Sequence, residues 1–400
     1  MHRLIILILS AIAFAYGCSS KPNPRVAEPH PALELITTIQ AHFVPDRRVN
    51  RLDVEMVPRS DGTLVLRGET TLPIAKDSLL SRLRAAAYQV VDSIRLLPAA
   101  ELGEHTWGLT RVSVANMRSA PGHSQELATQ ALLGTPVRVL QKNEEWYQVQ
   151  TPDGYLAWLN QGELVRLGAN ELARWRQSTR LVYTPLCGRA YQDASPLATP
   201  YGDLVAGCIL EQIGTRGAMT QVRYPDSSTA YVLTADLVPW AEWCGHADGE
   251  VAKAVVQRSV NLHGIPYLWG GTSPKGMDCS GFTKTLYWQQ GLILPRDASQ
   301  QLHAGVPVSY TEDLSGLTPG DFLFFGRYRQ DGSPKVTHVS IYLGDGNFIH
   351  AGADNGGVRI QNLLPTHPEY AAHRRASLMY ARRMQPGSTG VVPLREHPWY

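Results

Sequence analysis

The stretch Met277–Phe282, MDCSGF, decides how the last third of this chain folds. Beyond Cys279, Phe282 and Leu286 recur at a four-residue interval, which predicts an α-helix that begins near the cysteine and ends by Gly291. Cys279 would then stand at a helix N-terminus, where unpaired N–H groups and the helix dipole favour a thiolate and lower the cysteine pKa below about 8.5. The same N–H groups can stabilise an oxyanion. We predict that Cys279 is a nucleophile.

A strand–turn–strand pattern supplies the base that such a nucleophile needs. In Val336–Leu343 apolar residues alternate with others that include His338 and Ser340, so His338 is expected on the face away from the core. A turn at Gly344–Gly346 leads to a second strand that carries His350. A three-residue loop sets His350 opposite Ser340, one diagonal step of about 7–8 Å from His338, whereas a two-residue loop would put the histidines on opposite faces. We predict the three-residue loop, because a base needs a third group to orient its ring.

Composition limits the function classes that the chain can serve. Its 400 residues predict two to four domains, and 35 glycines with 27 prolines indicate many turns and short strands. Lysine and arginine number 37 against 35 aspartates and glutamates, a net charge of +2. A nucleic-acid-binding protein would show a marked basic excess, so nucleic acid is not an expected partner.

The first residues have the pattern of an export signal. Leu4–Tyr16 is apolar behind a basic start and is too short for a permanent membrane helix. Small residues then precede Cys18, which resembles the cleavage site of bacterial lipoproteins, and Ser19 resembles the sorting pattern of outer-membrane lipoproteins. We expect a signal peptide at 1–17, lipidation of Cys18, a tether at 18–31, and anchoring by lipid alone at the periplasmic face of the outer membrane. An ordinary secretory signal with an incidental Cys18 is the alternative.

Periodicity predicts that the rest of the chain is multidomain. Residues 32–104 alternate helix-like and strand-like segments, and we expect a small α/β spacer or docking unit there. Two β-rich segments follow at 105–166 and 178–240. The domain that contains the cysteine and histidine motifs occupies 250–383, with a tail at 384–400.

The two β-rich segments repeat a short pattern. Gln148–Asp153 (QVQTPD) is followed by Ala157-Trp158, and Gln221–Asp226 (QVRYPD) is followed by Ala230-Tyr231. Pro-Asp precedes a turn in both, with short alternating strands on either side. This pattern resembles tandem bacterial SH3-like barrels, and two generic small β domains are the alternative.

The remaining cysteines raise the question of a disulfide. Among Cys187, Cys208, Cys244 and Cys279, the pair expected to bond in an exported protein is Cys187 with Cys208, which lie in one short β-rich segment. No cysteine or histidine spacing suggests zinc, and no metal is expected.

Five motifs in order resemble the NlpC-type cell-wall cysteine peptidases: Pro266–Gly271, Asp278–Phe282, Leu317–Asp321, Thr337–Gly344 and Phe348–Ala351. The resemblance implies a papain-like α+β fold for 250–383. It also implies Cys279 as nucleophile, His338 as general base and acid, and His350 as the orienting third member. Ser299, in a segment that resembles one near the family's substrate cleft, is a possible polar contact.

The whole arrangement is similar to one subgroup, the γ-D-glutamyl-L-diamino acid endopeptidases with SH3-like domains ahead of the catalytic domain. In that subgroup the first barrel closes one end of the cleft and helps to bind a free N-terminal amino group. The matching residues here are Asp278, Ser280, Glu126 and Tyr155 around the amine, with Tyr267 and Trp269 flanking the nucleophile. The alternatives are a helix cap for Asp278, a solvated loop charge for Glu126 and a barrel-core position for Tyr155.

The resemblance implies hydrolysis of the γ-D-glutamyl–diamino acid bond in short wall peptides that begin with L-alanine, in peptidoglycan turnover or recycling. No metal or organic cofactor is expected. Two alternatives stay open: a papain-like amidase or acyltransferase on another exported substrate, and a mainly wall-binding lipoprotein. Oligomeric state does not follow from the sequence.

Overall fold

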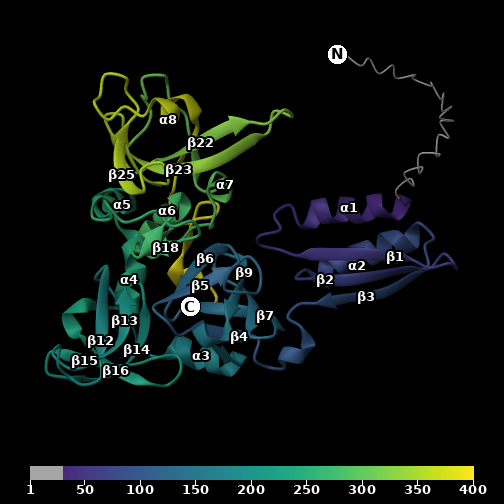
Figure 1. The fold of residues 1–400 in the computed structure, drawn as a ribbon, viewed down its shortest axis with the longest axis horizontal. Coiled ribbons are helices and arrows are strands. Elements are labelled where there is room, and N and C mark those ends of the chain that lie inside the picture. Colours follow the sequence, from purple (N-terminus) through teal and green to yellow (C-terminus); the bar gives the residue numbers. More distant parts are fainter. Residues whose placement is uncertain (1–29) are drawn as a thin grey trace, which may run out of the picture.

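The computed structural model describes residues 30–400 and is mostly β-structure with several short helices (Figure 1). The predicted signal peptide and the predicted lipidation at Cys18 lie outside the described residues. No helix within 30–400 has the length and apolar character needed to cross a membrane.

The N-terminal unit packs two helices against one small sheet. Its elements are α1 (Pro31–Phe43), β1 (Leu52–Pro58), β2 (Leu64–Thr70), α2 (Pro73–Ala85) and β3 (Val90–Leu96), followed by the 3₁₀ helix η1 (Ala100–Leu102). The strand order is β1-β2-β3, with β1 and β2 antiparallel and β2 and β3 parallel through the α2 crossover. Ile36 and Ile39, three residues apart on α1, are buried with Leu79 and Leu83 of α2, so the apolar helix faces form the core of this unit.

A seven-stranded antiparallel sheet follows. Its strands are β4 (Trp107–Thr110), β5 (Val114–Arg118), β6 (Leu127–Leu132), β7 (Pro136–Asn143), β8 (Trp146–Gln150), β9 (Leu156–Asn160) and β10 (Leu164–Leu167), with η2 (Gln161–Glu163) before the last. Their order in the sheet is β10-β4-β7-β8-β9-β5-β6. Alternate side chains such as Val137, Val139 and Val149 are fully buried in its core.

After α3 (Ala169–Gln177), a second seven-stranded sheet repeats this topology. Its strands are β11 (Arg180–Tyr183), β12 (Cys187–Tyr191), β13 (Pro200–Val205), β14 (Ile209–Arg216), β15 (Met219–Arg223), β16 (Thr229–Leu233) and β17 (Leu237–Pro239), with η3 (Thr234–Asp236) before the last. Their order, β13-β12-β16-β15-β14-β11-β17, matches the first sheet strand for strand when it is read from the other edge. The repeat in the sequence therefore corresponds to a repeat in topology.

The disulfide expected between Cys187 and Cys208 is absent from this part of the molecule. Both cysteines are free: Cys187 is exposed on β12, whereas Cys208 is buried. Cys187 pairs in register with Val205 across β12 and β13, and the Cys208 thiol donates to the backbone oxygen of Ser113 at 3.5 Å. Membership of one short β segment was not enough to bring the two thiols together.

The C-terminal domain sets helices against a six-stranded antiparallel sheet of order β21-β26-β22-β23-β24-β25. The sheet strands are β21 (Val306–Val308), β22 (Phe322–Tyr328), β23 (Pro334–Gly344), β24 (Asn347–Gly352), β25 (Gly357–Asn362) and β26 (Leu378–Arg383). The helices are α4 (Trp240–Gly245), η4 (His246–Asp248), α5 (Val251–Val260), α6 (Cys279–Trp288), α7 (Ala298–Gln301) and α8 (Ala372–Ser377). Two short ribbons complete it: β18 (Thr272–Ser273) with β19 (Gly276–Met277), and β20 (Leu292–Ile293) with β27 (Val392–Pro393), which precedes η5 (Leu394–Glu396).

Helix α6 packs on the sheet through its apolar side. Phe282 and Leu286, four residues apart, are fully buried with Val339 and Ile341 of β23 and Ile349 of β24. The spacing that predicts the helix is therefore the spacing that fixes it to the histidine-bearing strands. This packing brings the start of α6 to the middle of the sheet.

Candidate active site

The nucleophile predicted from the sequence lies at the first residue of α6. Asp278 is the N-cap, and its carboxylate accepts a hydrogen bond from the Gly281 amide at 2.7 Å. Cys279 is 8% exposed, and the backbone amides of Ser280 and Val339 lie close enough to its sulfur to favour the ionised form. Because Val339 directly follows His338 on β23, the thiol sits against the strand that carries the predicted base.

Burial decides the protonation state of Cys279. The enclosed site, together with the neighbouring Asp278 carboxylate, raises the pKa of the Cys279 thiol to about 12. The two backbone amides and the Arg296 guanidinium favour the thiolate but do not outweigh the burial. The thiolate expected from the helix position alone is therefore wrong for the free protein. The resting group is a thiol, and a base must take its proton.

The loop of the β23–β24 hairpin is shorter than predicted, but the two histidines still lie on the same face of the sheet. Gly344 pairs with Asn347, so the loop is the two-residue Asp345-Gly346, whose positive φ angles of 51° and 77° suit a tight hairpin turn. A bulge between Tyr342 and Gly344 then shifts the register by one, so that Ile341 pairs with Ile349. A two-residue loop alone would put the histidines on opposite faces; the one-residue shift at the bulge brings them back to the same face.

The two histidines consequently share one face and touch. His338 Nε2 and His350 Nδ1 are 2.7 Å apart, and the rings meet edge to face with centroids 4.8 Å apart. This face, which was expected to lie away from the core, is itself covered: His338 is 6% exposed and His350 is fully buried. Phe325 and Phe348 pack against the two rings in a second apolar cluster on this side of the sheet.

Gln361 on β25 fixes which nitrogen of each ring carries a proton. Its side-chain oxygen lies 2.9 Å from His350 Nε2, closer than the Asn355 side-chain nitrogen at 3.3 Å, so we assign the proton to Nε2 and the acceptor role to Nδ1 of the same ring. His338 Nε2 must then donate to His350, which leaves the lone pair of His338 Nδ1 free to accept a proton. The relay Gln361–His350–His338 thus prepares His338 as a base.

Burial keeps both imidazoles neutral. It lowers the pKa of His338 well below 6.5, and the nearby His350 and Arg374 act in the same direction. Burial also lowers the pKa of His350 to about 4, with the Arg374 charge adding to the effect. A neutral His338 can take the thiol proton at neutral pH.

Stability should therefore depend on pH through this pair. Between about pH 4 and 6.5 an unfolded chain protonates His350 while the folded chain does not, so the free energy of unfolding should fall as the pH drops below 6.5. The 2.5-unit window corresponds to about 3 kcal/mol for His350 alone. Urea unfolding at pH 7.5 and 5.0 covers 1.5 units of this window and should show a loss of about 2 kcal/mol. A His350→Gln variant should show a flatter dependence, and an equal slope in both proteins would contradict the assignment.

Both carboxylate oxygens of Asp278, the residue before Cys279, already accept hydrogen bonds from other groups of the protein. Asp278 Oδ1 accepts from Ser280 Oγ at 3.2 Å and from Arg296 Nη1 at 3.1 Å, besides the Gly281 amide. Asp278 Oδ2 accepts from the Gly270 amide at 3.0 Å and from Arg296 Nη2 at 2.6 Å. Arg296 is only 1% exposed, so this is a buried bidentate ion pair. The substrate contact predicted for Asp278 and Ser280 stays a prediction, and a ligand there would have to share these oxygens.

A cleft of about 480 Å³ opens at Cys279 and is shared by three parts of the chain. Its lining includes seven of the residues singled out in the sequence: Glu126, Tyr155, Trp269, Asp278, Cys279, Ser280 and Ser299. The described lining does not include the other three, Tyr267, His338 and His350. Tyr267 packs against the core cluster that contains Cys279, and the two histidines are buried behind the cleft wall, where Thr337 precedes His338 on β23. Burial and the neighbouring Cys279 raise the pKa of the Tyr267 hydroxyl.

Two residues of the first seven-stranded domain enter this cleft. Glu126 is exposed, and one of its carboxylate oxygens accepts from Trp269 Nε1 at 2.6 Å. The Tyr155 hydroxyl donates to Asp297 Oδ2 at 3.2 Å. A carboxylate and a phenol from the first seven-stranded domain therefore line the same cleft as Cys279.

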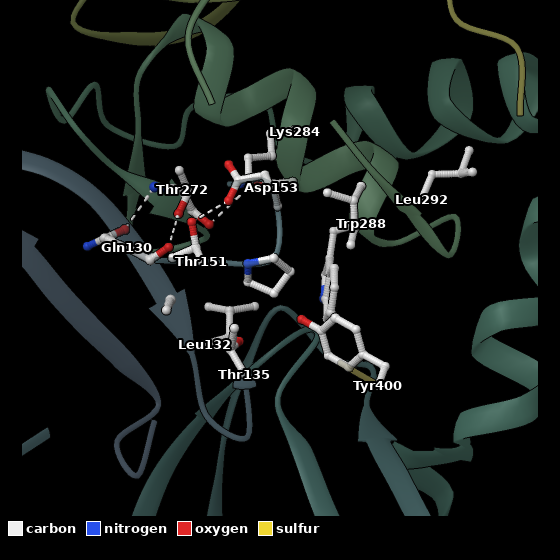
Figure 2. A pocket seen from close by; sticks show the side chains of 14 residues that line it. Gln130, Leu132, Thr135, Thr151, Asp153, Thr272, Lys284, Trp288, Leu292 and Tyr400 are labelled. Carbon is white, nitrogen blue, oxygen red and sulfur yellow. Dashed lines mark hydrogen bonds and ion pairs between the residues drawn. The ribbon is translucent and has the colours of Figure 1, made fainter. Parts of the chain in front are cut away.

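A polar junction holds the first seven-stranded domain against α6 (Figure 2). Lys284 of α6 forms an ion pair with Asp153, whose side chain is 2% exposed, and the Thr272 amide and hydroxyl donate to the side chain and backbone of Gln130 at 2.8 and 3.0 Å. Trp288 and Tyr400 line the other end of a cavity of about 60 Å³ beside these contacts. Because the junction joins β6 to β18 and the β8–β9 turn to α6, it fixes the strands that precede Tyr155.

Three residues that the sequence reasoning missed take part in the site: Arg296, Gln361 and Arg48. Arg296 lies three residues before Ser299, but nothing in the sequence showed that it pairs with Asp278. Gln361 lies two residues beyond Arg359, which opposes His350 in the sheet. Because alternate residues of a strand share a face, a prediction of this strand from the sequence would have placed Gln361 on the same face as His350.

Comparisons with known proteins agree with this geometry. The model of the NlpC/P60 family matches residues 264–375, which contain Cys279, His338 and His350. The model of the bacterial dipeptidyl-peptidase Sh3 domain matches residues 117–164, within the first seven-stranded sheet.

Individual relatives extend the similarity over most of the chain. The gamma-D-glutamyl-L-lysine dipeptidyl-peptidase of Bacillus cereus is 30% identical over 307 residues, which are 73% of this chain and 88% of that protein. The protein of the same name from Bacillus subtilis is 28% identical over 263 residues, 62% of this chain and 81% of its own. The crystal structure of an NlpC/P60 family protein from Bacillus cereus superimposes with a TM-score of 0.57 at 25% identity and covers 70% of this chain and 100% of that one. This chain therefore belongs to the NlpC/P60 family of peptidases and combines an NlpC/P60 domain with a bacterial SH3-like domain.

Proposed function

We propose that this protein is a cysteine peptidase that hydrolyses the γ-D-glutamyl–diamino acid bond of peptidoglycan peptides with a free N-terminal L-alanine. The observation that carries the proposal is the shared cleft, in which Glu126 and Tyr155 of the first seven-stranded domain line the same space as Cys279. An SH3-like domain that contributes to the cleft of the nucleophile gives the peptide a closed end to bind against. Relatives named gamma-D-glutamyl-L-lysine dipeptidyl-peptidases support the choice of bond.

The charges in the cleft favour a cationic group. Its lining contains the carboxylates of Glu126, Asp278 and Asp297 against the guanidinium groups of Arg48 and Arg296, an excess of one negative charge. An ammonium group would complete this balance, whereas an acylated amine would bring no charge and added bulk. Glu126 is the exposed carboxylate of the three and is the group that we assign to the ammonium.

The reaction follows from the protonation states. His338 Nδ1 takes the proton of the Cys279 thiol as the sulfur attacks the γ-carbonyl carbon of the D-glutamyl residue. The oxyanion that forms is stabilised by the backbone amide of Cys279 at the start of α6, since the Gly281 amide already donates to Asp278. His338 then returns its proton to the departing amine, so the diamino acid leaves and an acyl-enzyme remains. Water, deprotonated by His338, releases the L-alanyl-D-glutamate and restores the thiol.

Product analysis with defined peptides tests this function. The purified protein is incubated with L-alanyl-γ-D-glutamyl-L-lysine, with the corresponding diaminopimelate peptide, and with both after N-acetylation, and the products are identified by mass spectrometry. We expect release of the diamino acid from the free-amine peptides and at least about a tenfold lower rate after acetylation, because the charge contact is lost and the added group must fit a closed end. Equal rates on free and acetylated peptides would favour an amidase or acyltransferase of broader specificity.

The wider role is also part of the proposal. The matching strand order of the two seven-stranded sheets supports a second SH3-like barrel at 178–240. The sequence before residue 30 supports export and a lipid anchor at Cys18, which would place the enzyme where wall fragments are turned over and recycled. A mainly wall-binding role is disfavoured by the assembled relay of His338 and His350.

A further inference from the structure

The N-terminal unit reaches the cleft through one loop, the segment 44–51 between α1 and β1. In Figure 1 this loop extends from the unit toward α7 and β9. It is fixed to the first seven-stranded domain by backbone contacts, because the Leu156 amide donates to the Arg48 carbonyl at 2.7 Å and Gln150 Nε2 donates to the Val49 carbonyl at 2.9 Å. The loop therefore has one defined position beside the cleft.

Arg48 in this loop enters the cleft and binds the segment at the start of α7. Its Nη1 donates to Asp297 Oδ2 at 2.8 Å and to Ser299 Oγ at 2.9 Å. Its Nε and Nη2 donate to the two carboxylate oxygens of Asp46 at 2.8 Å each, and Gln300 Nε2 donates to Asp46 at 2.8 Å. The Arg48 side chain is still 39% exposed and lines the cleft, so it forms part of the wall.

The same contacts connect Arg48 to the end of the cleft that we assign to the substrate's amine. Asp297 Oδ2, which accepts from Arg48, also accepts from the Tyr155 hydroxyl. The guanidinium does not make this end cationic, since Asp46 and Asp297 together carry one charge more than Arg48. An ammonium is therefore tolerated there, and the arginine acts through its bulk and through the groups it holds.

We propose that Arg48 is a specificity-determining residue by which the N-terminal unit closes the amine end of the cleft, so that peptides extended or acylated at their first residue are excluded. This inference rests on the proposed function. A longer substrate would have to displace Arg48 and break its hydrogen bonds to Asp297 and Ser299. A peptide that ends at its free amine leaves those bonds intact.

Arg48→Ala tests the inference by selectivity. The readout is the ratio of kcat/KM for the free-amine tripeptide to kcat/KM for its N-acetylated form. We expect this ratio to fall about tenfold in Arg48→Ala, chiefly through a lower KM for the acetylated peptide. Arg48→Lys, which keeps the length and charge of the wall, should retain most of the wild-type ratio. The matched control is Arg47→Ala, because Arg47 is the adjacent residue, is 72% exposed and pairs with Asp53 at the surface.

The outcomes separate this inference from the function on which it rests. Two results overturn the inference alone, provided that the wild-type protein is selective for the free-amine peptide. One is an unchanged kcat/KM ratio in a folded Arg48→Ala variant. The other is an equal loss of selectivity in Arg47→Ala. A wild-type protein that is inactive on both peptides overturns the proposed function and the inference with it. If Arg48→Ala does not fold, as judged by circular dichroism, Arg48→Gln provides the same comparison, because it removes the fork that holds Asp297 and Ser299 together.

Discussion

Replacing Cys279 with alanine is expected to lower hydrolysis of the free-amine tripeptide by about 10⁴-fold or more, because no acyl-enzyme can form without the sulfur. The variant should remain folded: the side chain is small, and the Asp278 cap and the burial of Phe282 and Leu286 hold α6 without it. Release of the diamino acid, measured by mass spectrometry over time, gives the rate, and thermal unfolding checks the fold.

Cys244→Ala is the matched control for this experiment. Cys244 is 4% exposed, and burial raises the pKa of its thiol to about 11, so it resembles Cys279 in environment but lies in a different core cluster on α4. We expect its activity to stay within about threefold of the wild type, since it removes only one buried atom away from the cleft. Wild-type activity in Cys279→Ala, or a comparable loss in Cys244→Ala, would contradict the assignment of the nucleophile.

The regular elements could be predicted from the sequence because their apolar periods are undisturbed. The spacing of Phe282 and Leu286 predicts α6, and the alternation in Val336–Leu343 predicts β23, and both are present where expected. The hairpin loop was predicted incorrectly, because a bulge at Leu343 leaves no distinctive residue pattern. The correct prediction that both histidines share a face came only from the argument that a base needs a third group to orient its ring.

The environment of the site could not be predicted, because it depends on contacts between distant segments. The thiol pKa is set by how deeply Cys279 is enclosed, and no local motif reports that enclosure. Arg48 and Asp297 are 249 positions apart in the sequence, and only the packing of the N-terminal unit brings them together. The sequence therefore led to the proposed reacting groups but not to the residues that surround them in the structure.

The second large effect is expected from Arg296→Met. This substitution leaves the Asp278 carboxylate buried with no positive partner, and breaking a buried pair in this way costs about 3–5 kcal/mol of unfolding free energy. Activity should fall as well, because Asp278 caps the helix that begins at Cys279. Urea unfolding followed by tryptophan fluorescence measures the stability, and Arg327→Met, at an exposed site on β22, is the control that should change neither property.

The double variant Asp278→Asn/Arg296→Met decides whether charge is the cause. Asparagine can still accept the Gly281 amide as an N-cap but carries no charge, so removing both charges should restore a large part of the lost stability. The contrary result is a double variant that is less stable than Arg296→Met by the full cost of a lost cap. In that case the start of α6 is supported by the packing of the arginine side chain and not by its pairing with Asp278. Recovery of stability without recovery of activity would show that the reaction needs the negative charge of Asp278, either to hold the thiol in position or to make the predicted contact with the substrate.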